Sequence, residues 1–218
     1  MPTNYPYSSE PENKRLYTEA FDAFYTRFAT LYDRLVKWLP LWRNWIAPAL
    51  PALRGPRVLE VSFGTGYLLT QYAHPFDAYG LDYNRRMAEI ARRNVVQHRL
   101  TARLLVGQVE ALPFGSAAFD SVLNTMAFTG YPDAHQALSE MRRVLKPGGR
   151  LVMIDINFPA DGNWRGMAIA KAWARGGDIL RDMDALFQEF GLPYTDRTVG
   201  GWGSVRLYVA TKPGGTAG

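Results

Sequence analysis

The chain has 218 residues and no cysteine, which excludes a disulfide scaffold, a thiolate metal site, an iron–sulfur cluster and a cysteine nucleophile. It has only three histidines, so we predict no metal site. The net charge of +5 permits attraction to phosphate or to an anionic membrane without requiring it. Its length and its hydrophobic fraction of 47% indicate one globular α/β domain, alone or with a short arm.

The first 54 residues predict a polar tail followed by a helical arm. Residues 1–13 do not resemble a secretory signal and are expected to be flexible. From Lys14 onward, apolar residues recur at steps of three and four, as on one face of a helix. This face comprises Phe21, Phe24, Phe28, Leu31, Leu35 and Trp38. Pro40 kinks or ends the helix, and further prolines exclude a transmembrane span, so a cytoplasmic protein is expected.

From residue 55 onward, short apolar strands alternate with helices. Strands are predicted over 57–61, 76–81, 102–106, 119–123 and 150–156, with helices over 67–72, 85–98 and 134–145. A helix over 178–190 then precedes a hairpin of strands over 194–199 and 205–211. This order predicts an α/β fold with a doubly wound, mostly parallel, seven-stranded Rossmann-like sheet and an antiparallel C-terminal hairpin strand. We therefore divide the chain into a helical N-terminal arm or lid (1–54) and a sheet domain (55–218).

The most informative segment, residues 58–68, predicts a strand, a glycine turn and the start of a helix. Gly64 and Gly66 allow a ligand to approach the backbone closely, although a tight turn in any α/β protein would look similar. Glu60, in the strand, would repel a pyrophosphate and suit a cationic ligand. Asp82 closes the second strand, where an acid is placed to accept the hydroxyls of a ribose. Together these residues indicate a nucleoside ligand with a positive charge and a carboxylate.

Four sequence blocks follow one another in a fixed order. They cover residues 58–66, 80–84, 109–114 together with 118–122, and 143–151. With these blocks the chain resembles the class I S-adenosylmethionine-dependent methyltransferases, in the branch close to the ubiquinone- and menaquinone-biosynthesis enzymes. The resemblance implies a methyltransferase domain over residues 55–218, with S-adenosylmethionine as its cofactor and S-adenosylhomocysteine as the product.

The resemblance assigns the first cofactor contacts to the end of the first strand and to the glycine turn. Glu60 would face the methionine end of the cofactor, against which the turn would lie. The turn residues assigned to the cofactor are Ser62, Gly64, Thr65 and Gly66. Ser62 stands where the family usually has its first glycine, and Phe63 follows where a small residue is usual. We therefore expect a more crowded loop.

The remaining implied cofactor contacts follow later strands. Asp82 would bind the ribose, and Tyr83 would flank the adenine. Gln108 and Val109 occupy the place where the family contacts the adenine amino edge, and Asn124 would lie near the transferred methyl group. An acid often stands at the position of Gln108, whose amide accepts hydrogen bonds without charge assistance, so a lower cofactor affinity is expected.

Methyl transfer from a sulfonium needs alignment of the reactants, and it needs a base only where the acceptor loses a proton. Four residues are candidates for that base or for acceptor contact: Tyr25, Tyr32, Tyr131 and His135. Residues 24–33 resemble the family's Tyr-Asp lead-in, in which an arm tyrosine lies near the methionine carboxylate or the acceptor. Alternatively, both arm tyrosines pack as core. For His135 the plainer interpretation is the exposed first turn of a helix capped by Asp133.

The arm also carries tryptophans beside basic residues. These are Trp38, Trp42, Trp45, Arg34, Lys37 and Arg43. Such a segment suits peripheral contact with a membrane surface, but a stripe at helical spacing also suits a lid packed on the sheet domain. The segment 158–175 is a second candidate cap for an apolar acceptor.

The sequence predicts a methyltransferase for a small, apolar or lipid-like acceptor, either a phospholipid amine or a quinone-like ring. One alternative is a cofactor-binding protein without transfer activity, suggested by the crowded loop. Another is a nucleic-acid methyltransferase, suggested by arginines over residues 85–103. These arginines spread around the helix, which favours a solvated face, so no nucleic-acid partner is expected.

Overall fold

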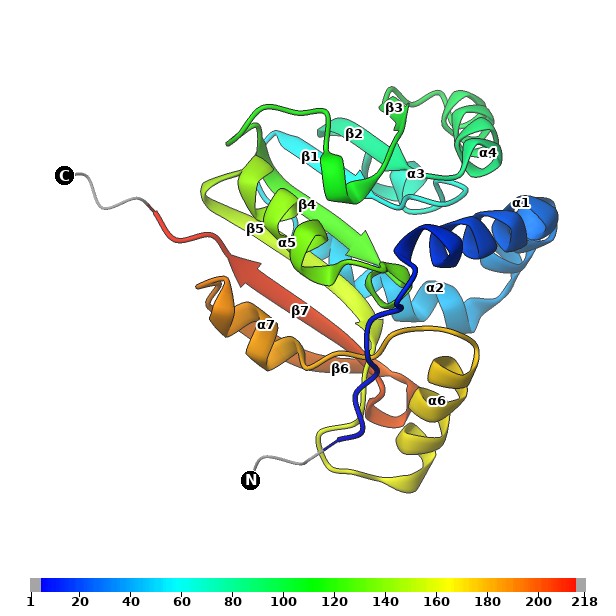
Figure 1. Cartoon of the computed structure of the whole chain (residues 1–218). Coiled ribbons are helices and arrows are strands. Elements are labelled where there is room, and N and C mark those ends of the chain that lie inside the picture. Colours follow the sequence, from blue (N-terminus) through cyan, green and yellow to red (C-terminus); the bar gives the residue numbers. More distant parts are fainter. Residues whose placement is uncertain (1–4, 215–218) are drawn as a thin grey trace.

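The computed structural model describes residues 5–214 and contains one seven-stranded sheet (Figure 1). The strand order is β3-β2-β1-β4-β5-β7-β6. The strands are β1 (Arg57–Val61), β2 (Asp77–Asp82), β3 (Arg103–Val106), β4 (Phe119–Thr125), β5 (Leu145–Ile156), β6 (Tyr194–Gly200) and β7 (Val205–Thr211). The first five strands are parallel to one another, and β7 is antiparallel to both β5 and β6. The predicted fold class is confirmed.

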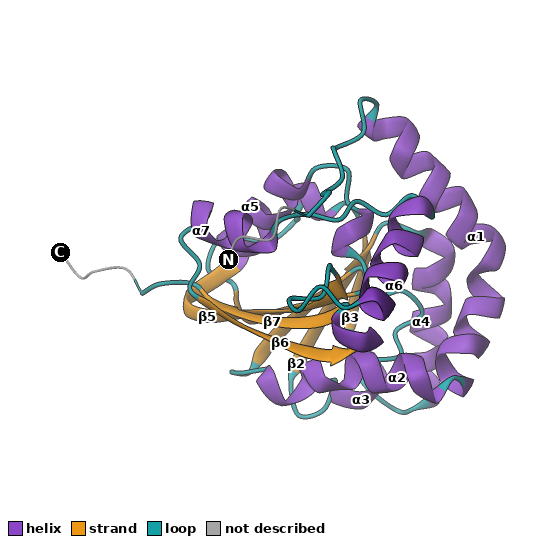
Figure 2. Cartoon of the chain, turned by 90° about the horizontal axis from the view of Figure 1, so that it is seen from below, coloured by secondary structure: helices purple, strands orange, loops and turns teal. Residues whose placement is uncertain are grey.

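Helices cover both faces of the sheet (Figure 2). They are α1 (Lys14–Trp38), α2 (Pro40–Ile46), α3 (Leu69–Tyr72), α4 (Arg85–Gln97), α5 (Ala134–Val144), α6 (Trp164–Arg175) and α7 (Met183–Glu189). On one face, α5 and α7 bury Leu138, Met141 and Phe187 against the sheet. On the other face, α3 and α4 bury Leu69 and Ala91. In the described part of the chain, no helix is both long and apolar enough to cross a membrane.

The central strand β1 explains where a ligand site forms. It pairs with β2 on one side and with β4 on the other. The chain therefore adds β2 and β3 on one side of β1 and then crosses over to add β4 and β5 on the other side. Four of its five residues are buried, as expected for a parallel strand covered on both faces. In an open α/β sheet, such a reversal of strand order opens a crevice at the carboxyl ends of the strands. The glycine turn that follows Val61 lies at this crevice.

The predicted flexibility of residues 1–13 is wrong for the part that the structure describes; residues 1–4 lie outside it. The ring of Tyr5 stacks on Phe158 with centroids 4.9 Å apart, and its hydroxyl donates to the Pro159 carbonyl. The backbone N–H of Ser8 donates to the Leu180 carbonyl at 2.8 Å. Aromatic burial and backbone hydrogen bonds therefore dock this segment on the sheet domain.

Helix α1 has the predicted bounds, but most of the expected apolar face, all except Phe21, points outward. Trp38 is 81% exposed and Leu35 is 44% exposed, and Phe24 and Leu31 are exposed as well. A second stripe faces the domain, with Ala29 buried against α4 between two partly buried tyrosines. Small and aromatic residues at a neighbouring helical spacing let α1 approach closely, so this stripe packs instead of the more apolar one.

The tryptophans of the arm divide between the two environments. Trp42 and Trp45 are partly buried against the core on the face of the sheet that α3 and α4 cover, as the lid interpretation expects, whereas Trp38 is exposed. The predicted helix over 178–190 is also shorter, because α7 begins only after Asp182, whose side chain caps it. The division of the chain into an arm and a sheet domain stays a prediction.

Candidate active site

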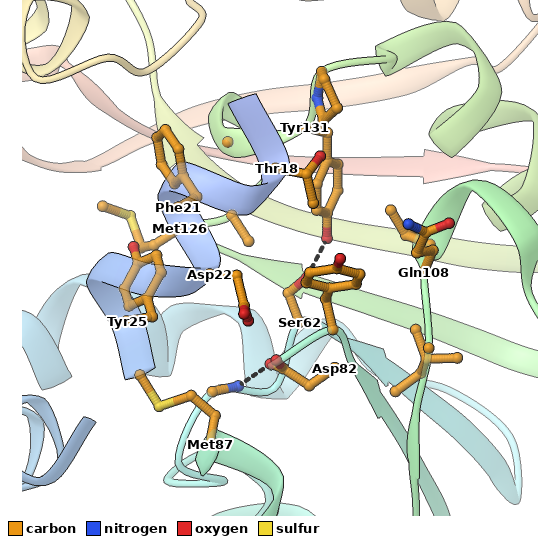
Figure 3. Close-up of a pocket in the computed structure, with 18 of the residues that line it drawn as sticks. Thr18, Phe21, Asp22, Tyr25, Ser62, Asp82, Met87, Gln108, Met126 and Tyr131 are labelled. Carbon is orange, nitrogen blue, oxygen red and sulfur yellow. Dashed lines mark hydrogen bonds between the residues drawn. The ribbon is translucent and has the colours of Figure 1, made fainter. Parts of the chain in front are cut away.

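A pocket lies at the carboxyl ends of β1, β2 and β4, beneath α1 (Figure 3). Its floor includes Ser62, Gly64 and Asp82 from the strand ends. Its roof comes from α1, which points Phe21 and Tyr25 into it. A smaller adjoining cavity shares Tyr32, Ser62, Gly64 and Thr125 with the first and reaches Glu60.

The glycine turn has the backbone conformation that its sequence implies. Gly64 has φ of 56° and Gly66 has φ of 74°, which are left-handed values that favour glycine. A Cβ on Gly66 would lie 2.9 Å from the Cβ of Ala91, so this glycine also lets α4 pack on the turn. Gly66 supports the pocket from behind and does not line it.

Ser62 adopts φ of 56°, which costs a residue with a side chain about 1–2 kcal/mol. Its hydroxyl is 2.7 Å from the hydroxyl of Tyr131, which is drawn as a dashed line in Figure 3. The crowding expected here comes from Phe63, which is buried, packs against Gly80 and lines the smaller cavity but not the first pocket. A serine is therefore held in a glycine-like conformation and ties the turn to the loop after β4.

Asp82 ends β2 and lies in the first pocket. It is only 7% exposed, and its two oxygens accept hydrogen bonds from the backbone N–H groups of Gly64 and Asn84, at 2.7 and 2.8 Å. Burial raises the pKa of Asp82 to about 7, although the two backbone donors act in the opposite direction. The carboxylate is thus fixed in place with free lone pairs that suit hydroxyl donors.

Glu60 lies in β1 at the far side of the site and is 2% exposed. Its Oε2 has no hydrogen-bond partner among the described residues, and neither does the hydroxyl of Tyr72. Burial raises the pKa of Glu60 to about 8. A buried carboxyl group without a partner is costly, and an ammonium group would satisfy it. Glu60 and Asp82 therefore fit the amino and ribose ends of the cofactor that the sequence implies.

The residues assigned to the adenine line the same pocket. Tyr83, Gln108 and Val109 all contribute to its wall, together with Met87 from α4. Thr65 instead lines the smaller cavity, where its carbonyl accepts a hydrogen bond from Asn94 at 2.8 Å. Tyr83, Met87 and Val109 thus bring apolar surface to this part of the pocket, and Gln108 brings an amide.

Asn124 does not line either cavity. It is fully buried at the end of β4, and its amide donates to the hydroxyl of Tyr131 at 2.8 Å. Tyr131 does line the pocket and also bonds to Ser62. The structure therefore places Asn124 behind Tyr131, as a support for its hydroxyl.

Of the other three candidate acceptor contacts, two line the pocket and one lies outside it. Tyr25 and Tyr32 point from α1 to the pocket, and burial raises the pKa of Tyr25 to about 12. His135 lies outside the pocket because the first turn of α5 faces solvent. Its ring is 3.1 Å from Glu189, and Asp133 caps the helix as the plainer interpretation expected.

Several pocket residues carry no signal in the sequence blocks. They are Thr18, Asp22, Met126 and Asp178. Thr18 and Asp22 lie outside the apolar stripe predicted for α1, whereas Phe21 belongs to that stripe and lines the pocket as well. Asp178 follows Gly176 and Gly177, and this glycine pair was the one available sign of a loop in place of a helix start.

Two kinds of known protein are similar to this chain. Residues 59–153 match the family described as a methyltransferase domain. A demethylmenaquinone methyltransferase of Deinococcus radiodurans is 34% identical over 152 residues, which cover 66% of this chain and 63% of the relative. A ubiquinone/menaquinone biosynthesis C-methyltransferase of Geotalea uraniireducens is 30% identical, with 65% of each chain covered. The chain thus spans less than two thirds of the length of these curated relatives.

Solved structures share the fold. An S-adenosylmethionine-dependent methyltransferase of Thermotoga maritima, described as a possible histamine N-methyltransferase, superposes with a TM-score of 0.67 at 22% identity, covering 87% of this chain and 98% of its own. A phosphoethanolamine N-methyltransferase of Haemonchus contortus, in complex with S-adenosylhomocysteine, gives 0.69 at 16% identity, covering 90% and 60%.

The match to a methyltransferase domain over residues 59–153, the strand order and the acids of the crevice agree with the class I S-adenosylmethionine-dependent methyltransferase fold that the sequence predicts. The relatives named for quinone biosynthesis agree with the branch that the sequence blocks resemble.

Proposed function

We propose that this chain transfers a methyl group from S-adenosylmethionine to a quinone-like aromatic ring that carries hydroxyl groups. The main support is the arrangement of the two adjoining cavities. They bring together Glu60, whose Oε2 has no hydrogen-bond partner among the described residues, the fixed carboxylate of Asp82 and an aromatic roof from α1. The curated relatives named as quinone-biosynthesis methyltransferases support the choice of acceptor.

The cofactor supplies an electrophilic methyl group on a sulfonium, so the chain has to bind, orient and exclude water. Glu60 would pair with the ammonium group, and Asp82 would accept hydrogen bonds from the ribose. Tyr83 and Met87 would sandwich the base beside Gln108. The aromatic side chains of α1 would hold an apolar ring over the opposite end of the pocket.

The charges of the pocket favour a ring over a phospholipid amine. Lysine, arginine and histidine are absent from the described residues that line it, whereas Asp22, Asp82, Glu110 and Asp178 are present. A phosphate-bearing acceptor would meet only negative charge there, which is unfavourable in a partly buried site. An uncharged ring avoids this repulsion.

The test is an assay of two acceptors with S-adenosylmethionine. We expect methylated product by mass spectrometry from a reduced, short-chain demethylmenaquinone, and none from phosphoethanolamine. The reverse result would assign the amine acceptor instead. Cofactor binding without product from any acceptor would favour the alternative of a cofactor-binding protein.

We also propose that the exposed face of α1 touches a membrane, where an acceptor with an apolar tail would dissolve. The exposed face of α1 consists of Phe24, Phe28, Leu31, Leu35 and Trp38. Arg27 and Arg34 are exposed beside it, so cations flank the apolar stripe as on an interfacial helix. The helix also roofs the pocket, which would bring the entrance close to the lipid. A cytoplasmic location stays a prediction.

Sedimentation with anionic liposomes tests this contact. The double variant Leu35→Ser, Trp38→Ser should lose most binding, because both side chains are exposed and apolar. Trp202→Ser removes an equally large exposed tryptophan outside α1 and serves as the control. Equal sedimentation of all three proteins would reject the membrane contact.

A further inference from the structure

A chain of three oxygen-bearing side chains reaches the acceptor end of the pocket. Asp178, in the loop between α6 and α7, lines the pocket beneath Tyr25. Behind it, the hydroxyl of Thr129 lies 2.9 Å from Oδ1 of Asp178 and 3.0 Å from Oδ1 of Asp155. Asp155 and Thr129 are buried, whereas Asp178 is partly open to the pocket.

The Thr129 hydroxyl has one hydrogen, which it shares between two carboxyl groups. When both carboxyl groups are ionised, this hydrogen can serve only one of them fully. At lower pH, a proton on one carboxyl group supplies the second hydrogen bond. Asp155 also accepts hydrogen bonds from the backbone N–H groups of Thr129 and Ile156, which favour its ionised form. The proton therefore resides more readily on Asp178.

The surroundings of Asp178 place its proton equilibrium close to neutral pH. Burial raises the pKa of Asp178 to about 6, and the charge of Asp155 acts in the same direction. From α1, Tyr17 and Tyr25 face it with raised pKa values of their own, so both are neutral. Arg181, the nearest buried cation, donates to the carbonyls of Phe128 and Tyr131 rather than to either acid.

Tyr25 is partly buried and lines the pocket, and its hydroxyl has no hydrogen-bond partner among the described residues. A hydroxyl on the bound ring would take up this hydrogen bond. Tyr25 and Asp178 thus offer one donor and one acceptor at the same end of the pocket.

We infer that Asp178 is the general base that removes the proton from a hydroxyl group of the acceptor ring, with Thr129 and Asp155 as positioning residues. This inference rests on the proposed function. In the step, the O–H bond of the acceptor breaks and the proton passes to the carboxylate of Asp178. The electron pair stays on the acceptor oxygen and makes the ring more nucleophilic. A base with a pKa near the working pH is effective in such a transfer.

The main experiment compares Asp178→Asn with the wild-type protein over a range of pH, using a reduced short-chain demethylmenaquinone as acceptor. We expect kcat to fall by about 100-fold or more at pH 7, the usual contribution of a general base. The wild-type rate should rise with a midpoint near pH 6. The variant should lose that midpoint and regain rate only toward the pKa of a phenolic hydroxyl, at about 10.

Two measurements do not depend on turnover. Calorimetry with S-adenosylhomocysteine should give unchanged affinity for Asp178→Asn, because Asp82 and Glu60 remain. Infrared titration of the free protein should show one protonated-carboxyl band fewer near pH 6 in the variant. Asp184→Asn, an exposed acid on α7, is the matched control and should change neither result.

Thr129→Val gives a second, independent test in case Asp178→Asn does not fold. Loss of the hydroxyl donor removes a hydrogen bond that lowers the pKa of Asp178. The midpoint of the rise in rate with pH should therefore move to higher pH. An unmoved midpoint in both variants would overturn the role of Asp178 while the proposed function stood. No methylated ring from the wild-type protein would overturn the proposed function and this step with it.

Discussion

The two halves of the site are held by different forces. On the cofactor side, Asp82 and Glu60 extend from paired strands in the middle of the sheet, and backbone N–H groups hold Asp82 in place. On the acceptor side, α1 lies on α4 through side-chain hydrogen bonds. Asn84 donates to Asp22 and Thr26 at 2.7 Å, and only a small cluster around Ala29 is buried there.

The two halves of the site therefore differ in how much free energy it costs to open them. Opening the cofactor side would break strand pairs in the middle of the sheet, at a cost comparable with global unfolding. Opening the arm would break a few polar contacts and uncover little apolar surface, so it belongs to the low-stability end of the molecule. The acceptor side can therefore adapt while the cofactor side stays fixed.

The largest expected effect comes from Asp82→Ala on the cofactor side. Losing hydrogen bonds to a charged acceptor should weaken the binding of S-adenosylhomocysteine by about 100-fold in calorimetry. Asp77→Ala, at the exposed opposite end of the same strand, is the control and should bind normally. Equal affinity in Asp82→Ala would show that the ribose lies elsewhere.

Glu60→Gln should change binding and stability in opposite directions. The neutral amide removes the charge that would pair with an ammonium group, so affinity should fall by about 10-fold. The free protein should become more stable in denaturant titrations, because a buried acid without a partner is removed. A loss of both affinity and stability would mean that Glu60 is structural.

The same two acids predict how the stability of the free protein depends on pH. Their pKa values in the folded protein are about 8 for Glu60 and about 7 for Asp82, above the ordinary values of 4.5 and 3.8. At a pH between the ordinary pKa of each acid and its raised pKa, the folded chain keeps a proton that the unfolded chain has released. The free energy of unfolding therefore falls as pH rises. The slope should approach about 1.4 kcal/mol per pH unit for each group. Thermal unfolding from pH 5 to 8 measures it, and a rising stability would contradict the burial of these acids.

The smallest effect is expected on the arm. Asp22→Ala removes a partner of Asn84, and the free energy of unfolding should change by less than about 1 kcal/mol. Hydrogen exchange of the α1 amides should nevertheless accelerate, while the amides of β1 stay protected. Faster exchange in both regions would show that arm and sheet open as one unit.

The sheet and its two acids could be predicted because their signals are local. A buried strand, a glycine turn and an acid at the next strand end determine their own geometry, and the parallel sheet then brings them together. The packed face of α1 could not be predicted in this way. Two stripes at helical spacing compete in its sequence, and the choice depends on how closely α4 can be approached.

Asp178 and the docked segment that contains Tyr5 were missed for a related reason. Each is placed by contacts with residues more than 45 positions away, at Thr129 and Phe158, and no periodicity records such contacts. His135 was an ambiguous signal, because a loop residue at the ligand edge of a sheet and a first-turn residue facing solvent have the same sequence context.

Asn84 joins the two halves through one side chain and its own peptide. Its backbone N–H donates to Asp82, its Oδ1 caps α4 at Met87, and its Nδ2 holds Asp22 and Thr26. Whatever free energy occupancy of Asp82 adds to the closure of α1, closure must add equally to the binding free energy of the cofactor. Since α1 roofs the pocket, we expect an ordered kinetic scheme in which the cofactor enters first and its product leaves last.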